Sequence, residues 1–294
     1  SKKGIMKKVP VMIISSEISA ENENICFKYG VFDFIGRPFK TSIVRKRVQN
    51  MINIYVYKNH LEQQVQEQTA VLRKAYEKLE KQKERVEKLN KDILDMLGTI
   101  VEFRNLESGE HIMRVKGYTK ILAEKFKELY PEYNLTDETI DNIVEASALH
   151  DLGKISIPDK ILLKPGKLTK EEFEYMKLHT VKGCELIQAV NLEQSEELKQ
   201  ICYDIIRYHH ERYDGKGYPD GLKGDEIPVS AQLVSLADVY DALINERCYK
   251  DAFSNEKAFN MIMNGECGTF SPKLLETFKQ VRDKFERFAI EERK

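Results

Sequence analysis

The stretch EASALHDLGKISIP, residues 145–158, decides the fold, because a helical run ends there at a histidine–aspartate pair. Gly153 stops the helix just beyond that pair, so we expect His150 and Asp151 to point at one place where the backbone turns away. A carboxylate can bridge two cations through its two oxygens while imidazoles complete each shell, and paired cations suit in-line attack on phosphorus. The pair therefore predicts a metal centre in a helical domain, with Asp151 as the bridging ligand.

Histidines gather around this stretch in a way that favours metal binding. The chain has six histidines, and five of them lie in the second half beside carboxylates: His111, His150, His179, His209 and His210. A lone histidine is more often a core or surface residue than a ligand, but five with acidic partners favour a ligand set. Glu107 stands four residues before His111, so the two side chains share a face if that segment is helical.

An acidic residue on an apolar helix adds to this prediction. Asp238 lies in VSLADVYDAL, residues 234–243, where an unpaired carboxylate would be costly to bury. We therefore expect Asp238 to face a cation. Asp241 fits the same spacing, although we interpret it as an acid that supports a ligand or lies on the helix surface.

Capping signals predict that nearly all of the chain after Asn105 is helical. Thr136 or Asp137 begins a helix expected to run to His150, and Ser271 with Pro272 opens the last helix. Thr169 and Glu172 form a predicted capping box. The loops rich in glycine and proline, residues 157–166 and 214–228, follow histidine segments and are expected to form walls of a site.

Residues 60–96 contain no glycine or proline and carry apolar residues at every seventh position. One such set is Val65, Leu72, Leu79, Val86 and Ile93, and the set between them is Leu61, Ala75, Leu89 and Met96, with Gln68 and Gln82 in its gaps. This stripe predicts a parallel coiled coil that makes the chain a homodimer and joins an upstream sensor or receiver segment to the rest. The alternative is a single solvated helix lying on its own domain.

The first fifty residues alternate between strand-like and helical segments. VPVMIISS, residues 9–16, and GVFDFIGRPF, residues 30–39, resemble the last strands of a response-regulator receiver domain. Arg37 stands where that family has lysine, and the segment with the phosphoacceptor aspartate is missing, so we expect an incomplete fragment that is not phosphorylated. The predicted domains are residues 1–53, 54–97 and 98–294.

Composition bounds the remaining function classes. With 47 basic and 48 acidic residues, the chain has no field that favours binding of bulk nucleic acid. The five cysteines form no CxxC pair, which predicts free thiols and a cytoplasmic location. The apolar run at residues 9–14 is too short to cross a membrane, so a soluble chain is expected. Ser1 is not a methionine, and the natural protein is expected to be longer.

Five motifs together resemble the HD-GYP branch of the HD phosphohydrolases: ESGEH (107–111), HDLGK (150–154), LHTVKG (178–183), YHHERYDGKGYPDGLKGDEIP (208–228) and LADVYDALINERCYK (236–250). The resemblance implies a mainly α, HD-type helical bundle. It implies that the metal ligands are His111, His150, Asp151, His179, His209, His210 and Asp238. It also implies iron or manganese as the metal, although these residue types are equally compatible with zinc or nickel.

The resemblance also implies a substrate and a reaction. The expected substrate is cyclic di-GMP, opened to the linear dinucleotide and on to GMP. Beyond the resemblance, we expect a hydroxide held between metals to attack the phosphorus, with Asp151, Lys154 and Asp214 in the catalytic machinery. Asp214 is expected first to hold its loop, and otherwise to orient a histidine or move a proton. The cations expected to contact phosphate are Lys154, Lys182, Arg247 and Lys250.

Glu107 distinguishes this chain within the resemblance, because the family commonly reads RDPYTGGH where this chain reads RNLESGEH. Glutamate at this place implies a third metal, so two or three divalent ions are expected; the alternative is that Glu107 only orients a ligand histidine.

Three other functions stay open: another cyclic dinucleotide such as cyclic GMP-AMP as substrate, a general HD nucleotidase or triphosphohydrolase, and a binding-only sensor of cyclic dinucleotides.

Overall fold

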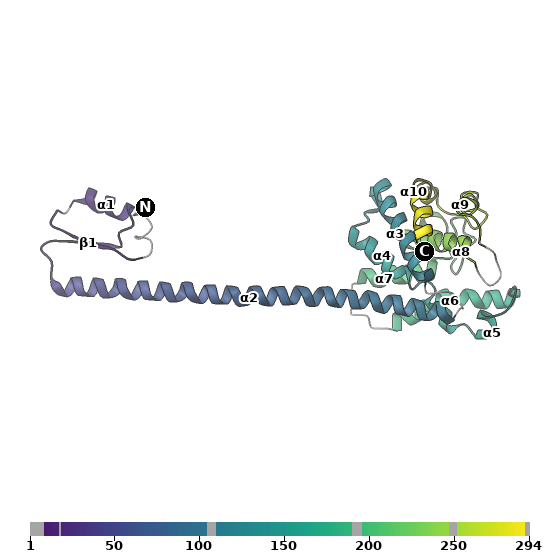
Figure 1. The fold of residues 1–294 in the computed structure, drawn as a ribbon, viewed down its shortest axis with the longest axis horizontal. Helices are drawn as coiled ribbons and strands as arrows, with labels where there is room; N and C mark the ends of the chain where they lie inside the picture. The colour runs from purple at the N-terminus through teal and green to yellow at the C-terminus, as the bar shows by residue number, and fades with distance from the viewer. Residues whose placement is uncertain (1–8, 18, 105–109, 190–195, 247–251, 292–294) are drawn as a thin grey trace. The chain divides into compact units, whose positions relative to one another are not determined.

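A computed structural model describes residues 9–291, except for residue 18 and the segments 105–109, 190–195 and 247–251. The chain divides into two compact units, Ser1–Arg85 and Val86–Lys294, which we call the first unit and the helical unit. The boundary falls within one long helix, α2 (Thr41–Arg104) (Figure 1). The predicted boundaries near residues 53 and 97 both lie inside this helix and remain predictions.

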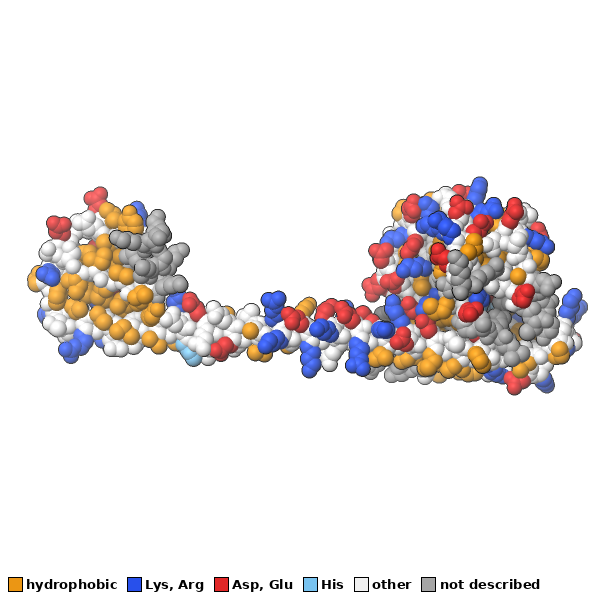
Figure 2. All heavy atoms as spheres, in the orientation of Figure 1, with side chains coloured by type: hydrophobic (Ala, Val, Ile, Leu, Met, Phe, Trp, Pro, Cys, Tyr) orange, Lys and Arg blue, Asp and Glu red, His pale blue; other side chains and the backbone are white. Residues whose placement is uncertain are grey.

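The first unit holds two strands with a helix between them, as the sequence predicts, and the structure pairs the strands in a parallel sheet. Strands β1 (Met12–Ser15) and β2 (Asp33–Gly36) pair in parallel and are joined by helix α1 (Ala20–Lys28). The hydroxyl of Ser19 accepts a hydrogen bond from the Asn22 amide and so caps α1. Hydrophobic side chains gather on the visible face of this unit (Figure 2), and Ile25 and Phe27 remain exposed, because so small a sheet covers little apolar surface.

The helical unit is nearly all helix, which confirms the predicted fold class. Its α-helices after α2 are α3 (Glu110–Leu129), α4 (Asp137–Ser147), α5 (Asp159–Leu162), α6 (Lys170–Ala189), α7 (Glu196–Tyr208), α8 (Val229–Ile244), α9 (Asn255–Met263) and α10 (Pro272–Glu291). Its short 3₁₀ turns are η2 (Pro131–Tyr133), η3 (Leu152–Ser156) and η4 (Gly224–Glu226).

The predicted helix starts are confirmed by hydrogen bonds. The Thr136 hydroxyl accepts from the Thr139 amide at 3.0 Å, and Thr169 and Glu172 exchange both bonds of a capping box. Ser271 caps α10 by accepting from the Leu274 amide. One predicted helix end was wrong: α4 ends at Ser147, and His150 lies in the turn that follows rather than in the helix.

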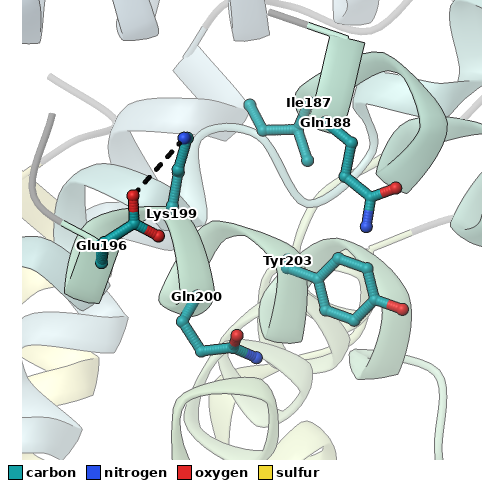
Figure 3. Close-up of a pocket in the computed structure, with 6 residues that line it drawn as sticks. All are labelled: Ile187, Gln188, Glu196, Lys199, Gln200 and Tyr203. Atoms are coloured by element: carbon teal, nitrogen blue, oxygen red, sulfur yellow. Dashed lines mark ion pairs between the residues drawn. The ribbon is translucent and has the colours of Figure 1, made fainter. Parts of the chain in front are cut away.

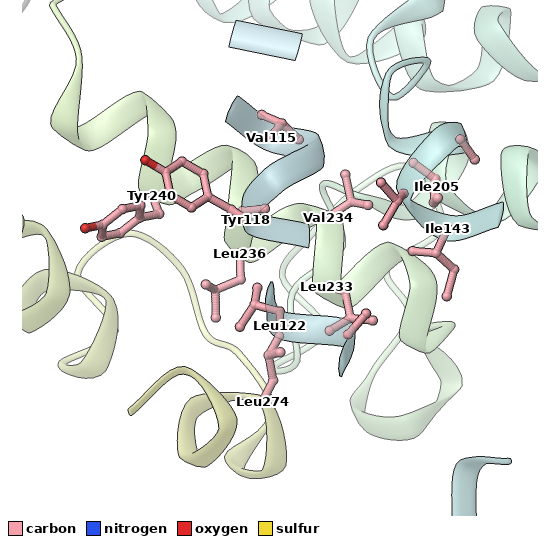
Figure 4. Close-up of a cluster of buried hydrophobic side chains, with 14 of the residues drawn as sticks. Val115, Tyr118, Leu122, Ile143, Ile205, Leu233, Val234, Leu236, Tyr240 and Leu274 are labelled. Carbon is pink, nitrogen blue, oxygen red and sulfur yellow. The ribbon is translucent and has the colours of Figure 1, made fainter. Parts of the chain in front are cut away.

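Helix α8 forms the centre of the core. It is apolar on nearly all sides, so it is buried, and it packs against α3, α7 and α9. Leu233, Val234 and Leu236 from α8 belong to the same cluster of buried side chains as Tyr118 and Leu122 of α3 (Figure 4). Of the two acids on this helix, Asp241 is buried and Asp238 is partly exposed.

The last turns of α2 differ from the rest of that helix. The apolar seam of the predicted coiled coil is exposed along its length, including Leu72 and Leu79. By contrast Leu94, Gly98 and Val101 are buried against the helical unit. Helix α2 is therefore exposed to solvent along the predicted seam and packed against the helical unit at its end. Dimerisation through the seam stays a prediction.

Two expectations about the environment of the chain concern cysteines and membranes. The cysteines among the described residues are free, which agrees with the predicted thiols; Cys248 lies outside those residues. Within the described segments, we find no helix with the length and apolar character needed to span a bilayer.

Candidate metal centre

Four ligand-type side chains meet at the turn after α4. Asp151, His179, His209 and His210 each offer an atom within 4.8 Å of the others, and we call them the first ligand group. The Asp151 Oδ1 atom lies 3.4 Å from Nε2 of His179 and 3.8 Å from Nε2 of His209. The residues come from the α4–η3 turn, the middle of α6 and the end of α7, so three distant segments converge on one carboxylate.

Glycines make this convergence possible. A Cβ atom added to Gly153 would overlap the carbonyl oxygen of His179, and one added to Gly183 would lie 2.5 Å from Cγ2 of Ile206 and 3.0 Å from the Gly153 amide nitrogen. Turn η3 therefore packs backbone to backbone on α6. The glycines of HDLGK and LHTVKG thus bring Asp151 beside His179.

A second ligand group adjoins the first. Glu102, His111 and His150 also offer atoms within 4.8 Å of one another, from α2, α3 and the turn after α4. The His150 Nε2 atom lies 3.3 Å from Oδ2 of Asp151, so the aspartate faces both groups. Asp238 on α8 completes the cluster, with its Oδ1 atom 3.6 Å from Nε2 of His111.

The imidazole rings are oriented for metal binding. The Nδ1 atoms of His150, His179 and His209 each lie 2.8–2.9 Å from a backbone carbonyl oxygen, to which they donate. In the neutral form of each ring, that donation leaves Nε2 as the unprotonated nitrogen. The Nε2 atoms of His179 and His209, and Oδ1 of Asp151, are buried and have no hydrogen-bond partner among the described residues. Imidazole nitrogens and carboxylate oxygens in this state fit a divalent cation.

Residues 109–274 match a family model described as HD domain, and the residues of both groups except Glu102 fall within that match. The chain belongs to the HD domain family, in its HD-GYP branch. The resemblance seen in the motifs is thereby confirmed.

Curated relatives of this HD-GYP chain carry related names. It is 35% identical to a probable cyclic di-GMP phosphodiesterase of Vibrio cholerae, over 97% of this chain and 64% of that protein. It is 32% identical to a cyclic di-GMP phosphodiesterase of Thermotoga maritima, over 94% of this chain and 73% of that one. It is 38% identical to 3'3'-cGAMP-specific phosphodiesterase 2 of Vibrio cholerae, over 67% of this chain and 35% of that one. The chain thus spans less than two thirds of the length of two of these three relatives.

Charges in the HD-GYP site are strongly coupled. Burial disfavours the charged form of His150, but the carboxylate of Asp151 outweighs it and raises the pKa of His150 to about 10. Burial lowers the pKa of His209 to about 3, and the charge of His150 adds to that effect. Despite its burial, Asp151 has a pKa well below the usual value, because Lys154 and His150 lie beside it. Of these three residues, only His150 has a raised pKa, so cation binding at His150 must release a proton.

The predicted phosphate-contacting cations are placed unequally. The ammonium group of Lys154 pairs with Oδ2 of Asp151 and so lies at the cluster. Lys182 instead pairs with Glu185, three residues along α6, at 3.8 Å. Arg247, Lys250 and the predicted ligand Glu107 lie outside the described residues.

Asp214 lies in the loop after α7 and makes contacts that hold this loop. Its Oδ2 atom accepts hydrogen bonds from Arg212 at 2.9 Å and from the Thr269 hydroxyl at 3.1 Å, and its Oδ1 atom accepts from the Lys216 amide. Asp214 is not a member of either ligand group. These contacts fit the first of its predicted roles.

The GYP segment folds back over the histidines. A Cβ atom on Gly217 would overlap the backbone of Glu211, and Oε1 of Glu211 accepts from the amides of Asp220 and Gly221. This fold places the Tyr218 ring 4.7 Å from the His210 ring. A glycine, an acid and an aromatic ring thus form one wall of the site.

A cavity of about 340 Å³ opens beside this wall. Its lining includes His209 and His210, the aromatic rings of Phe173 and Tyr218, and the cationic side chains of Lys177 and Lys216. Another hollow, of about 220 Å³, lies between α6 and α7 (Figure 3). None of the predicted site residues that the structure describes lines that second hollow, whereas His209 and His210 line the first, so we take the cavity at His210 as the candidate substrate cleft.

Sequence reasoning missed Glu102, and it gave no role to Lys177, Lys216 or Phe173. A signal for Glu102 was present: it continues the spacing of the buried residues Leu94, Gly98 and Val101, so it falls on the docked face of α2. Asp241 was interpreted as a possible support, and its Oδ2 atom lies 2.7 Å from Nδ1 of His111.

Proposed function

We propose that this chain is a metal-dependent phosphodiesterase that hydrolyses a cyclic dinucleotide, with cyclic di-GMP as the first candidate substrate. The supporting observation is the placement of two ligand groups on either side of one aspartate, beside a cavity lined by cations and aromatic rings. The expected product is the linear dinucleotide pGpG, followed by GMP. The names of the curated relatives support the same class of reaction.

The residues around the cleft have separable roles in this proposal. Lys154, Lys177 and Lys216 offset the negative charge of the substrate's phosphates. Phe173 and Tyr218 offer apolar ring faces on which a nucleobase can stack. Asp214 keeps the loop that carries Lys216 in place through its bond to the Lys216 amide.

Bound metals would supply the remaining chemistry. Two or three divalent cations, iron first and manganese second, would neutralise phosphate oxygens and activate water for attack on phosphorus. Asp151, His179, His209 and His210 would hold one cation, and Glu102, His111, His150 and Asp238 would surround another. The Nδ1 hydrogen bonds of the histidines keep the ligand nitrogens aimed inward.

One relative favours a second candidate substrate. The chain is also similar to a protein named as specific for 3'3'-cGAMP, so hydrolysis of cyclic GMP-AMP is the alternative. The cleft has cations and rings common to both substrates, and these do not select a base. A general nucleotidase and a binding-only sensor are further alternatives that the experiment below separates.

We also propose that the chain acts in the cytoplasm as a homodimer that receives a signal from an upstream segment. The exposed seam of α2 supports pairing, because large apolar side chains such as Leu72 and Leu79 otherwise remain in water. Free thiols support a reducing compartment.

The test is a substrate panel with protein purified without oxygen and loaded with iron or with manganese. It compares cyclic di-GMP, 3'3'-cGAMP, cyclic di-AMP and nucleoside triphosphates, with products separated by chromatography. We expect cyclic di-GMP to be opened fastest, activity to be lost with a chelator, and activity to return with metal. Hydrolysis of triphosphates alone contradicts the proposal, and so does tight dinucleotide binding by fully loaded protein without turnover.

A further inference from the structure

The end of α2 carries one acidic residue on its buried face. Glu102 is only 1% exposed and follows Leu94, Gly98 and Val101 at helical spacing. On another face of the same turns, Ile100 and Phe103 are exposed and continue the two seven-residue sets from Ile93 and Met96. Helix α2 therefore combines a buried acid with the continuation of its apolar seam.

Close contacts fix this end of the helix to the metal centre. A Cβ atom on Gly98 would overlap the carbonyl oxygen of Ala148, which is two residues before His150. The guanidinium group of Arg104 donates hydrogen bonds of 2.6–2.8 Å to the carbonyl oxygens of Lys154, Ile155 and Ile157. The backbone on both sides of Glu102 is therefore anchored to the segment that carries His150 and Asp151.

The carboxylate of Glu102 lies in surroundings that suit a metal ligand. Both of its oxygens are buried without a hydrogen-bond partner among the described residues. One of them lies within 4.8 Å of ligand nitrogens of both His111 and His150. Burying a carboxylate in this way is costly unless a cation neutralises it.

We propose that Glu102 is a ligand of a divalent cation held with His111 and His150, and that helix α2 thereby completes the metal centre. This inference rests on the proposed function only in taking the site to be a metal centre. Glu102 lies outside the region that matches the HD domain, so the second cation depends on a helix that the matched region does not include. This assignment differs from the sequence-based prediction for Glu107, which is tested in parallel.

The first experiment measures bound metal in Glu102→Gln, which keeps the shape of the side chain and removes its charge. Elemental analysis of protein loaded with manganese is expected to find one cation fewer per chain than in wild type. Glu145→Gln is the matched control, because Glu145 is a half-buried acid of the same unit that pairs with Lys116 at 2.7 Å and is not a member of either ligand group. It is expected to keep every cation. A full metal complement in Glu102→Gln would overturn the assignment.

The second experiment follows thermal unfolding with and without metal. Without metal, Glu102→Gln is expected to unfold at a temperature no lower than wild type, because a neutral amide replaces a buried carboxylate that has no hydrogen-bond partner among the described residues. With metal, it is expected to unfold at a lower temperature, because a ligand is gone. Glu145→Gln should lower the unfolding temperature in both conditions, because it breaks an ion pair. An equal shift for Glu102→Gln in both conditions would mean that Glu102 has only a structural role.

Further variants keep the result interpretable. If Glu102→Gln does not fold, Glu102→Asp retains the charge and is expected to weaken the second cation by about tenfold or more, because its carboxylate is one methylene shorter. Unchanged affinity in Glu102→Asp contradicts the proposal. Glu107→Gln, in the same assays, should keep the cation that Glu102→Gln loses. None of these readouts uses substrate. If the wild-type protein binds no metal, the proposed function is overturned. If the wild-type protein binds metal and is active, and the Glu102 variants bind as much metal as wild type, only this inference is overturned.

Discussion

The two ligand groups have similar chemistry but different origins in the chain. The first group, Asp151, His179, His209 and His210, lies wholly within the region that matches the HD domain. The second group combines His111 and His150 with Glu102, which lies on α2 before that region begins. The difference indicates that the HD fold supplies one set of ligands by itself, while the other set needs a helix from outside it.

The largest effect is expected where the two groups meet. Asp151→Ala should remove both cations and lower turnover by about 10³-fold or more, since Asp151 faces both groups and several kcal/mol of charge stabilisation are lost. Elemental analysis and product chromatography measure the two effects. Asp137→Ala, a change at an exposed acid on α4, is the control. A variant with both metals and full turnover would contradict the bridging role.

A paired experiment separates the groups. His179→Ala should lose the first cation and keep the second, whereas His111→Ala should do the reverse, because each histidine belongs to only one group. Metal content per chain is the measurement, and turnover should fall strongly in both variants. His60→Ala, at the exposed histidine of α2, should keep all cations. If either site variant loses every cation, the two groups form a single site that does not divide.

A smaller effect is expected from the residue that orients His111. Asp241 accepts from Arg114 at 2.6 Å and lies 2.7 Å from Nδ1 of His111. Asp241→Asn should weaken the second cation by about 10–100-fold and leave the first unchanged. Metal titration followed by elemental analysis measures the difference. Asp204→Asn, at a half-buried aspartate on α7, is the control, and an equal loss from both groups would refute a role specific to His111.

The smallest effect on bound metal is expected from a substitution that disrupts the apolar seam of α2. Leu72→Glu should weaken the dimer by about 100-fold or more, because burial of each leucine contributes roughly 1.5–3 kcal/mol and both chains change. Val71→Glu is a matched control: Val71 is 68% exposed and Leu72 70%, but Val71 is not at a seam position. Sedimentation measures the dimer. Metal content should not change, because every ligand comes from one chain; metal lost together with the dimer would show that the second group requires pairing.

Much of the fold and of the first ligand group was predictable from local patterns. Caps at Thr136, Thr169 and Ser271 depend on neighbouring residues alone, so the sequence determines them directly. The motif HDLGK and the histidine pair after α7 predict metal ligands, because histidines and acids are adjacent in the sequence there.

What the sequence could not provide was contact between distant segments. Glu102 has no histidine within one helical turn in the sequence, and contacts such as the packing of Gly98 on Ala148 and the Arg104 hydrogen bonds bring it to His150. The seven-residue apolar pattern also made the buried face of α2 difficult to predict. The same turns of the helix carry exposed seam residues on one face and buried residues on another. The roles of Lys177 and Phe173 likewise depend on how the GYP segment folds back over α6, which no local pattern specifies.

The docking of α2 also sets the smallest piece of this protein that can be studied alone. Leu94 belongs to the hydrophobic core, and Asp95 binds Lys116 of α3 at 2.6 Å. A fragment cut to the matched residues 109–274 would lose these contacts, Glu102 and most of α10, which packs on α3. A truncated protein that keeps both ligand groups must therefore begin before Leu94, within a helix, and carry part of the seam with it.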